Sequence, residues 1–147
     1  MRRGLAAAVA LLAAGMLVAQ QAPDYTIGDN PFQAEYPFAL GQPVQLRAEV
    51  QGIRFDALTV VALDEVKSGA KVRCEVQLTG TGAPEKKATV SVVVLLEDAK
   101  GTGLDRLTLD GFKVKAAKPF DEKQRVTVAG DALGTATKVY VFIQLAF

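Results

Sequence analysis

The side chains that could carry out chemistry in this sequence are few and isolated. The chain contains one cysteine, Cys74, and no histidine, so the commonest general base and the commonest metal ligand are both missing. Cys74 alternates in phase with Val72 and Val76, which predicts a buried, inert thiol. Ser68 and Ser91 are the only serines, and neither lies in a Gly-x-Ser-x-Gly turn. We therefore expect that the protein is not an enzyme.

Carboxylates are the next candidates, because calcium prefers oxygen ligands. Glu97, Asp98, Asp105 and Asp110 are expected near one end of the fold. Their spacing does not match the Asp-x-Asp-x-Asp-Gly loop, and aspartate is a common turn residue. We expect no metal site and no cofactor. A calcium- or carbohydrate-binding module stays open as an alternative, and it would need convergent carboxylates or exposed aromatic side chains on loops.

The first residues have the order of a secretory signal peptide. Arg2 and Arg3 precede an uncharged apolar run, Leu5–Val18, and small residues follow it. This run is shorter than the roughly 20 residues that a membrane-spanning helix needs. We expect cleavage of residues 1–22, with Ala19 or Gln20 as alternative sites, and no transmembrane anchor. The protein should therefore be exported, to the periplasm or the extracellular space.

The composition of the remaining chain limits its partners. Loss of residues 1–22 removes two of the 17 basic residues, so 125 residues with a net charge of −1 remain. Such a balance argues against binding to nucleic acid or to an anionic membrane surface, both of which favour clustered positive charge. The length corresponds to one domain, and a single cysteine cannot form an internal disulfide, so a hydrophobic core must hold the fold.

Strands must provide that core, because the dominant period from residue 42 onward is two. Apolar and polar residues alternate over Val44–Val50 and, most regularly, over Ala70–Leu78. Seven or eight strands at this spacing predict an all-β fold, an immunoglobulin-like antiparallel two-sheet sandwich over residues 42–147. Residues 23–41 are punctuated by prolines, and we expect an irregular segment whose aromatic side chains pack onto the sandwich.

Several local irregularities are also predicted. The phase of the second strand slips near Asp56-Ala57, which indicates a bulge, and one helical turn is expected at 131–133. Asp98–Gly103 is expected to be a turn. Asp110-Gly111 is typical of a turn or bulge between two short strands, 104–109 and 112–116. Positive φ is expected at Gly101 or Gly103 and at Gly111.

The C-terminal half resembles a known family. The segment Val-Val-Val-Leu-Leu-Glu-Asp-Ala-Lys-Gly at 92–101 is similar to the aliphatic strand, Leu-Tyr-Asp and glycine turn of bacterial exported immunoglobulin-like domains of the FxLYD type. Residues 112–128, in which Lys118-Pro119 leads into the next strand, resemble the segment that follows. Glu97 replaces the family's aromatic residue, and Phe120 replaces its glycine. The resemblance implies the fold and an accessory or adhesion role, and it assigns no functional residue.

Two expected strands have more apolar residues than one buried face requires. The second set is Val93 and Leu95 on one strand, with Tyr140 and Phe142 on the other. Large exposed apolar patches are uncommon on soluble monomers, so something must cover this set. One possibility is internal cover by the N-terminal aromatic residues Tyr25, Phe32, Tyr36 and Phe38. The other is a docking surface for a partner protein or a second copy, with Tyr140 as an anchor.

These observations favour a non-catalytic exported binding or structural module, with a possible protein partner or homo-oligomer and no nucleic acid. A subunit of a larger envelope assembly stays open as an alternative. A small outer-membrane β-barrel is a further alternative, because the last strand has apolar residues at every second position and ends in Phe147. Against the barrel, the alternate face of that strand is not polar, as a lumen would require.

Overall fold

Alternating apolar and polar residues produce nine strands within residues 24–147, and a short helix follows the eighth. The computed structural model describes residues 24–147, so the expected signal peptide, residues 1–22, lies outside the described residues. No helix within residues 24–147 has the length and apolar character needed to cross a bilayer. The elements are β1 (Thr26–Gly28), β2 (Phe32–Pro37), β3 (Val44–Val50), β4 (Ile53–Ala62), β5 (Lys71–Thr81), β6 (Ala88–Glu97), β7 (Gly103–Val114), β8 (Pro119–Ala129), α2 (Gly130–Thr135) and β9 (Lys138–Ala146).

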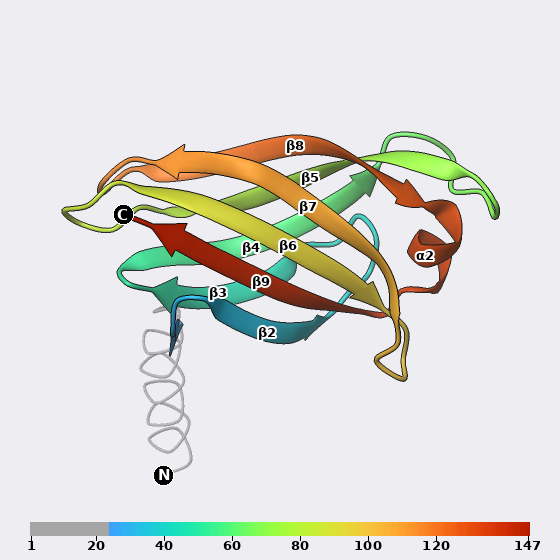
Figure 1. Ribbon diagram of the computed structural model, residues 1–147, viewed down its shortest axis with the longest axis horizontal. Helices are drawn as coiled ribbons and strands as arrows, with labels where there is room; N and C mark the ends of the chain where they lie inside the picture. The colour runs from blue at the N-terminus through green and yellow to red at the C-terminus, as the bar shows by residue number, and fades with distance from the viewer. Residues whose placement is uncertain (1–23) are drawn as a thin grey trace, which may run out of the picture.

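The strands form two sheets that pack face to face (Figure 1). The five-stranded sheet has the order β1-β3-β4-β5-β8, and the four-stranded sheet has the order β2-β9-β6-β7. Every strand pair is antiparallel except β1 with β3. The predicted all-β two-sheet sandwich is thus confirmed, with nine strands rather than seven or eight. Within residues 24–147 the strands thus form two separate sheets.

The expectation of an irregular segment at residues 23–41 is wrong. β1 pairs in parallel with β3, and β2 pairs along its whole length with β9, so that Phe32 faces Ile143 and Pro37 faces Lys138. Both strands lie at sheet edges, where a proline costs no ladder hydrogen bond. The prolines therefore delimit short edge strands, and the segment between β1 and β2 crosses from one sheet to the other.

The two short strands expected around Asp110-Gly111 form a single strand, β7. Its pairing with β6 shifts register between Val90 and Val92, so Asp110 and Gly111 together lie opposite Ser91 as a bulge. Gly101 has the expected positive φ of 81°, whereas Gly111 does not lie in the positive range. The bulge predicted near Asp56-Ala57 is confirmed by a register shift. The helical turn expected at 131–133 is confirmed as part of α2.

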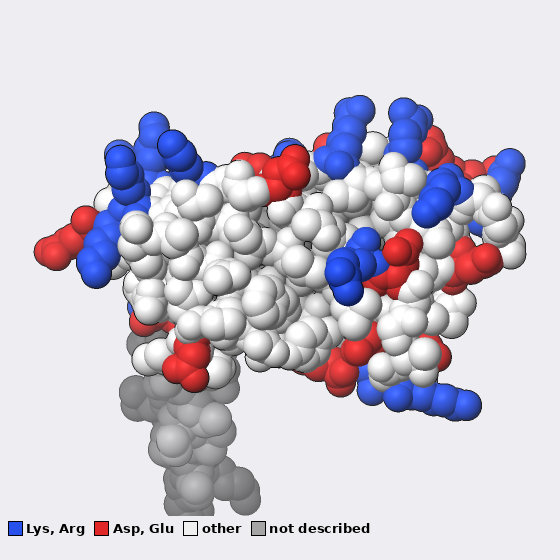
Figure 2. All heavy atoms as spheres, in the orientation of Figure 1, with Lys and Arg blue, Asp and Glu red and all other residues white. Residues whose placement is uncertain are grey.

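The outer faces of the two sheets differ in polarity. On the five-stranded sheet, the outward residues of β5 and β8 are polar: Lys71, Arg73, Glu75, Gln77, Thr79, Asp121, Lys123, Arg125 and Thr127. Figure 2 views the outer face of the four-stranded sheet, and a broad central area of it carries no charged side chain. Charged residues lie mainly around this area.

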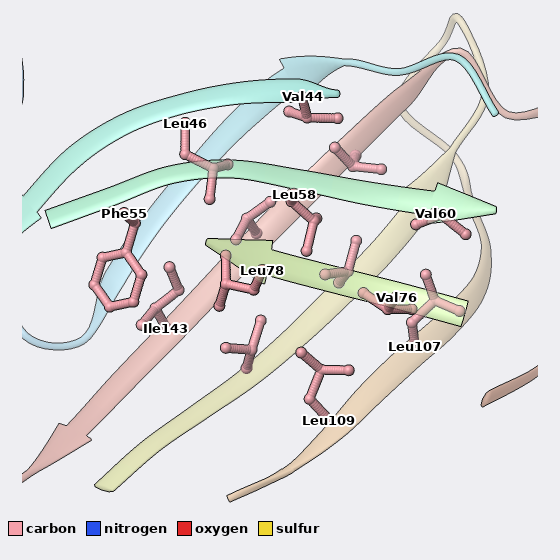
Figure 3. Close-up of a cluster of buried hydrophobic side chains, with 14 of the residues drawn as sticks. Val44, Leu46, Phe55, Leu58, Val60, Val76, Leu78, Leu107, Leu109 and Ile143 are labelled. Atoms are coloured by element: carbon pink, nitrogen blue, oxygen red, sulfur yellow. The ribbon is translucent and has the colours of Figure 1, made fainter. Parts of the chain in front are cut away.

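The core lies between the sheets and consists of aliphatic side chains with few aromatic ones. Figure 3 shows Leu58, Val76 and Leu78 of the five-stranded sheet opposite Leu107 and Ile143 of the four-stranded sheet. All five side chains are at most 1% exposed. This burial follows from the period-two pattern, because each strand places every second side chain in the same layer. The core fixes the position of the opposite, outward side chains of the four-stranded sheet.

Candidate functional site

The site predicted from the sequence is assembled on the outer face of the four-stranded sheet. The pairing of β6 with β9 places Val93 directly opposite Phe142 and Leu95 directly opposite Tyr140. Residues paired in this way project on the same side of a sheet, with Cβ atoms about 5 Å apart. The structure therefore brings all four residues into one cluster at the centre of the face. We call Val93, Leu95, Tyr140 and Phe142 the apolar patch.

The apolar patch is only partly covered by its neighbours. All four of its side chains are half-buried, and together with Arg106 of β7 they line a hollow of about 280 Å³. Arg106 lies opposite Leu95 in the pairing of β6 with β7, so its side chain belongs to the same face. An apolar hollow beside a guanidinium group is a surface that can take an apolar side chain and a carboxylate together.

Polar groups surround the apolar patch. The hydroxyl of Tyr140 donates a hydrogen bond to Oε1 of Gln33, which fixes the tyrosine ring toward β2. Lys138 Nζ lies 3.7 Å from Oε1 of Glu35. Among residues 24–147, the guanidinium of Arg106 forms no ion pair. An apolar centre with a polar rim is the usual anatomy of a protein–protein interface.

Glu97 lies at one corner of this face and has an unusual environment for a carboxylate. Its side chain is 8% exposed, and its Oε1 has no hydrogen-bond partner among the described residues. Burial raises the pKa of Glu97, and the nearby carboxyl of Glu35 raises this pKa further. Lys138 opposes both effects only in part. The corner therefore favours the protonated form of Glu97.

The N-terminal aromatic residues do not cover the apolar patch, so the expectation of internal cover is wrong. Alternation along β2 directs Phe32 and Tyr36 to the inner face, where they pair with Ile143 and Val139. Phe32 is buried, and the hydroxyl of Tyr36 donates to the carbonyl of Leu46 in the other sheet at 3.1 Å.

The other two aromatic residues of this segment also lie elsewhere. Phe38 is buried in the core. Tyr25 donates a hydrogen bond to Asp56, and Arg54 stacks on its ring at 4.8 Å from the centroid. Both Asp56 and Arg54 belong to β4 of the five-stranded sheet. Nothing within residues 24–147 therefore lies over the apolar patch.

The rim of the site was not predicted from the sequence. Glu35 and Gln33 were missed because their segment was expected to be irregular. Arg106 could have been found, because it alternates with the buried residues Leu107 and Leu109. Its position beside Leu95 depends on the register of β6 with β7, which a bulge shifts.

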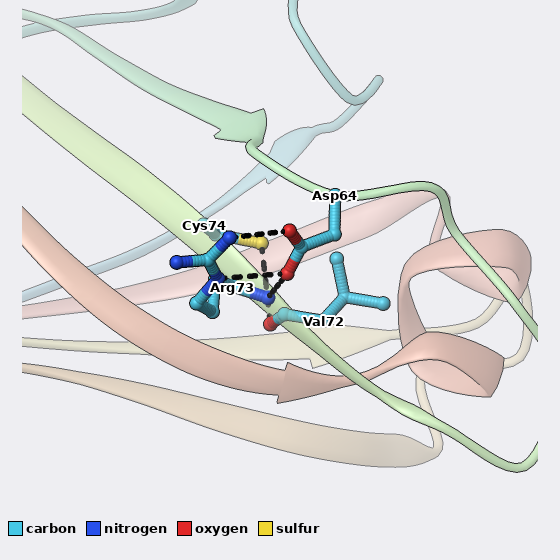
Figure 4. A network of polar contacts seen from close by, with 4 residues as sticks. All are labelled: Asp64, Val72, Arg73 and Cys74. Atoms are coloured by element: carbon cyan, nitrogen blue, oxygen red, sulfur yellow. Dashed lines mark hydrogen bonds and ion pairs between the residues drawn. The ribbon is translucent and has the colours of Figure 1, made fainter.

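The thiol of Cys74 is buried, as predicted, and lies outside the site. Figure 4 shows it on β5 beside the ion pair of Asp64 and Arg73. Its Sγ donates a weak hydrogen bond to the carbonyl of Val72 at 3.9 Å, and its side chain is fully buried. Burial raises the pKa of Cys74, and the charge of Asp64 raises it further. A thiol in this position is a poor nucleophile.

Two of the four carboxylates considered for calcium, Asp98 and Asp105, accept hydrogen bonds from backbone amides. Asp98 Oδ1 accepts hydrogen bonds from the amides of Lys100 and Thr102, both at 2.9 Å. The two carboxylate oxygens of Asp105 accept from the amides of Arg106 and Ala129, both at 2.8 Å. In the part of the chain that the structure describes, no three acidic, cysteine or histidine side chains converge on a possible metal site.

A carbohydrate site would need exposed aromatic rings on loops. Among the aromatic residues in 24–147, only Phe147 is mostly exposed, at 55%, and it follows the end of β9. Lys86 lies over its ring, 5.5 Å from the centroid. One such ring does not form a stacking platform, so the structure offers this alternative little support.

Comparison with known proteins adds no assignment. No protein-family model matches the chain, and no curated protein matches it. The resemblance to FxLYD-type domains stays a prediction, and the function must be argued from the site itself.

Proposed function

We propose that this protein is an exported, non-catalytic protein-binding module, and that the outer face of its four-stranded sheet is the binding surface. The basic and apolar N-terminal sequence, residues 1–22, supports export. A chain without histidine and with a buried thiol supports a non-catalytic role. The partner is a protein whose contact surface has an apolar centre and hydrogen-bonding or charged groups at its edge, because such a surface complements the apolar patch and its rim.

One observation carries this proposal, namely the difference between the two outer faces. The five-stranded sheet exposes charged and polar residues on β5 and β8, which is typical of a surface in contact with water. The four-stranded sheet has aromatic and aliphatic residues in the same structural position. Antiparallel sandwiches need only two apolar faces, and this protein has three. A third apolar face, left open by the rest of the described chain, favours association with another protein.

Aromatic residues at the centre of the patch should contribute most to binding. Tyrosine and phenylalanine bury large areas while losing little rotamer entropy, and they are frequent among residues that dominate interfaces. The hydrogen bond to Gln33 holds the ring of Tyr140 in place before a partner arrives. This preorganisation lowers the entropic cost of association.

The proposal predicts that Tyr140→Asp and Phe142→Asp, made singly, abolish binding and leave the fold intact. Both side chains are half-buried, so each change should lower the free energy of unfolding by only about 1–2 kcal/mol. The matched control is Thr127→Asp, which adds the same charge to the outer face of the five-stranded sheet. Urea unfolding measures the stability of all three variants.

Binding itself can be measured by photo-crosslinking in cells of the source organism. A photoreactive benzoylphenylalanine replaces Phe142 in one chain and Thr127 in another. Position 142 should crosslink to a protein, Tyr140→Asp should abolish the crosslink, and position 127 should give none. Equal crosslinking at both positions, or none at position 142, would contradict the proposal. So would a loss of stability of several kcal/mol in the Asp variants, since this would place the patch inside the fold.

A further inference from the structure

The outward residues of the four-stranded sheet form rows that run across its four strands. The central row, read from β2 to β7, is Glu35, Tyr140, Leu95 and Arg106. The next row in the same order is Gln33, Phe142, Val93 and Thr108. Both of these rows have polar residues on the two outer strands and apolar residues on the two inner strands. The ends of the central row have opposite charges.

We infer that the binding surface accepts a second copy of this chain, related by a two-fold axis that runs along the strands between β9 and β6. This inference rests on the proposed function and names the partner. This rotation places β9 of one copy opposite β6 of the second copy, and β2 opposite β7. Each row therefore faces the same row of the second copy, read in the opposite order. Closed two-fold interfaces of this kind need a surface that complements itself.

The central row fulfils this requirement by charge. Glu35 of one copy faces Arg106 of the second copy, and the same contact occurs again on the other side of the axis. Arg106 has no ion pair within residues 24–147, so the second copy supplies the carboxylate that its guanidinium lacks. Among residues 24–147, Glu35 forms an ion pair with Lys138 at 3.7 Å, and the side chain of Glu35 is 47% exposed. It can therefore accept a second partner.

The apolar centre complements itself in the same arrangement. Tyr140 of one copy meets Leu95 of the second, and Phe142 meets Val93. An aromatic ring thus packs on an aliphatic side chain four times across the axis, which is a favourable pairing between sheet faces. Had the aromatic residues lain on both inner strands, large side chains would have met each other in every row.

The outer rows add no conflict. In one neighbouring row Gln33 faces Thr108 of the second copy, and further along Gln144 faces Ser91. At the corner, Lys138 faces Glu97. In none of these rows do like charges meet. A partner with an unrelated sequence would need to reproduce this whole pattern, whereas a second copy carries it already.

The size of the face is sufficient for a specific dimer. β6 and β9 pair over five outward positions, whereas β2 has three. With strands about 4.8 Å apart and rows about 6.8 Å apart, the face covers roughly 600 Å². Two copies would then bury about 1,200 Å² in total, which is at the lower limit of specific interfaces. We therefore expect a dimer of moderate affinity whose stability depends on the central contacts.

Charge exchange across the axis tests the inference. Glu35→Arg places two arginines opposite each other at each contact of the homodimer, and Arg106→Glu places two glutamates there. Each variant alone should associate at least about tenfold more weakly than the natural chain in sedimentation equilibrium. A mixture of the two should regain the natural affinity within about threefold, because both contacts of the mixed dimer then join opposite charges.

The matched control uses a glutamate and an arginine on the outer face of the five-stranded sheet, the cross-strand pair Glu75 and Arg125. Glu75→Arg and Arg125→Glu should leave association unchanged. Two results would overturn the inference. One is that the natural chain without residues 1–22 remains monomeric at all concentrations. The other is that the mixture of the two variants associates as weakly as each variant alone. Urea unfolding shows whether each variant is folded.

A second measurement covers the case in which a charge variant does not fold. The natural chain with the photoreactive residue at position 142 should give a crosslinked species with the mass of two chains, joined within the segment that contains Val93. A crosslink from position 142 to a different protein would overturn the second copy as partner and still support the proposed function. No crosslink to any protein would overturn both.

Discussion

At the scale of single residues, two buried polar groups behave differently: the thiol of Cys74 is structural, and we expect the carboxyl of Glu97 to respond to pH. Cys74 and Glu97 are both buried, and burial raises the pKa of each. The thiol is neutral at physiological pH and fits an apolar site without cost. The carboxyl of Glu97 has an oxygen without a hydrogen-bond partner among the described residues, and it lies near Glu35, Asp98 and Lys138, so its interactions change when it is protonated.

Cys74 should be unreactive in the folded protein. Its labelling by a thiol reagent should be slow in buffer and fast in denaturant, because only unfolding exposes the Sγ atom. Cys74→Ser should lower the free energy of unfolding by about 1–3 kcal/mol, since a hydroxyl replaces a thiol in an apolar site. Rapid labelling of the native protein would show that this part of the core is open.

Glu97 should make the protein less stable as the pH rises. Its pKa in the folded state lies above that of the unfolded state, so its protonation favours folding at pH values below the unfolded pKa. This contribution is lost as the pH rises through the folded pKa. Glu35 and Asp98 strengthen the effect by their negative charge, and Lys138 weakens it.

Glu97→Gln should remove that part of the pH dependence and raise the free energy of unfolding at neutral pH. Urea unfolding of both proteins between pH 4 and pH 8 measures the difference. Glu75→Gln, on the opposite sheet, is the control, because Glu75 lies on the outer face of that sheet beside Arg125. Parallel curves for Glu97→Gln and the natural chain would refute this interpretation.

At the scale of elements, the sequence predicts strands well and their connections less well. The alternation of apolar and polar residues in β5 correctly predicted which side chains of this strand are buried, including Cys74. Such a pattern can be read locally, because it involves only residues that are adjacent in the sequence. The two edge strands of the N-terminal segment were missed, since their prolines are ordinary punctuation in a loop and acceptable at an edge. Whether a proline lies at an edge depends on which strands come together, and that is set by the whole chain.

The candidate site illustrates the same limit. The four residues of the apolar patch were identified because two strands had apolar residues on both faces. Arg106 and Glu35 lie beside the patch only because of strand order and register. Strand order and register cannot be predicted from a local sequence pattern. The bulge at Asp110-Gly111 also shifts the pairing of β6 with β7, and this shift decides that Arg106 lies opposite Leu95.

The glycines of the turn and the bulge should respond differently to substitution. Gly101 has φ of +81°, a region that alanine disfavours, so Gly101→Ala should lower the free energy of unfolding by about 1 kcal/mol. Gly111 lies outside this region, and an added Cβ would meet Thr89 at an ordinary 3.4 Å. Gly111→Ala should therefore change stability by less than about 0.5 kcal/mol. Chemical unfolding of both variants checks the contrast, and equal losses would show that the bulge is misassigned.

At the scale of the whole molecule, the sandwich combines two different surfaces. The outer face of the five-stranded sheet is polar on β5 and β8, and the opposite face of the molecule carries the apolar patch. One continuous hydrophobic core lies between the two sheets. In a dimer formed through the four-stranded sheets, four sheets would stack, and the polar faces would form the two outer surfaces of the pair.

The position of β9 has a consequence for how the protein is made. β9 is the last strand in the sequence, yet it lies inside its sheet between β2 and β6, which come from much earlier in the chain. Until β9 emerges, β2 has no neighbour in its sheet and β6 has one open edge. Contacts so distant in sequence form slowly. We therefore expect the four-stranded sheet to assemble only once β9 is available, and the closure of the sandwich to be slow for this reason.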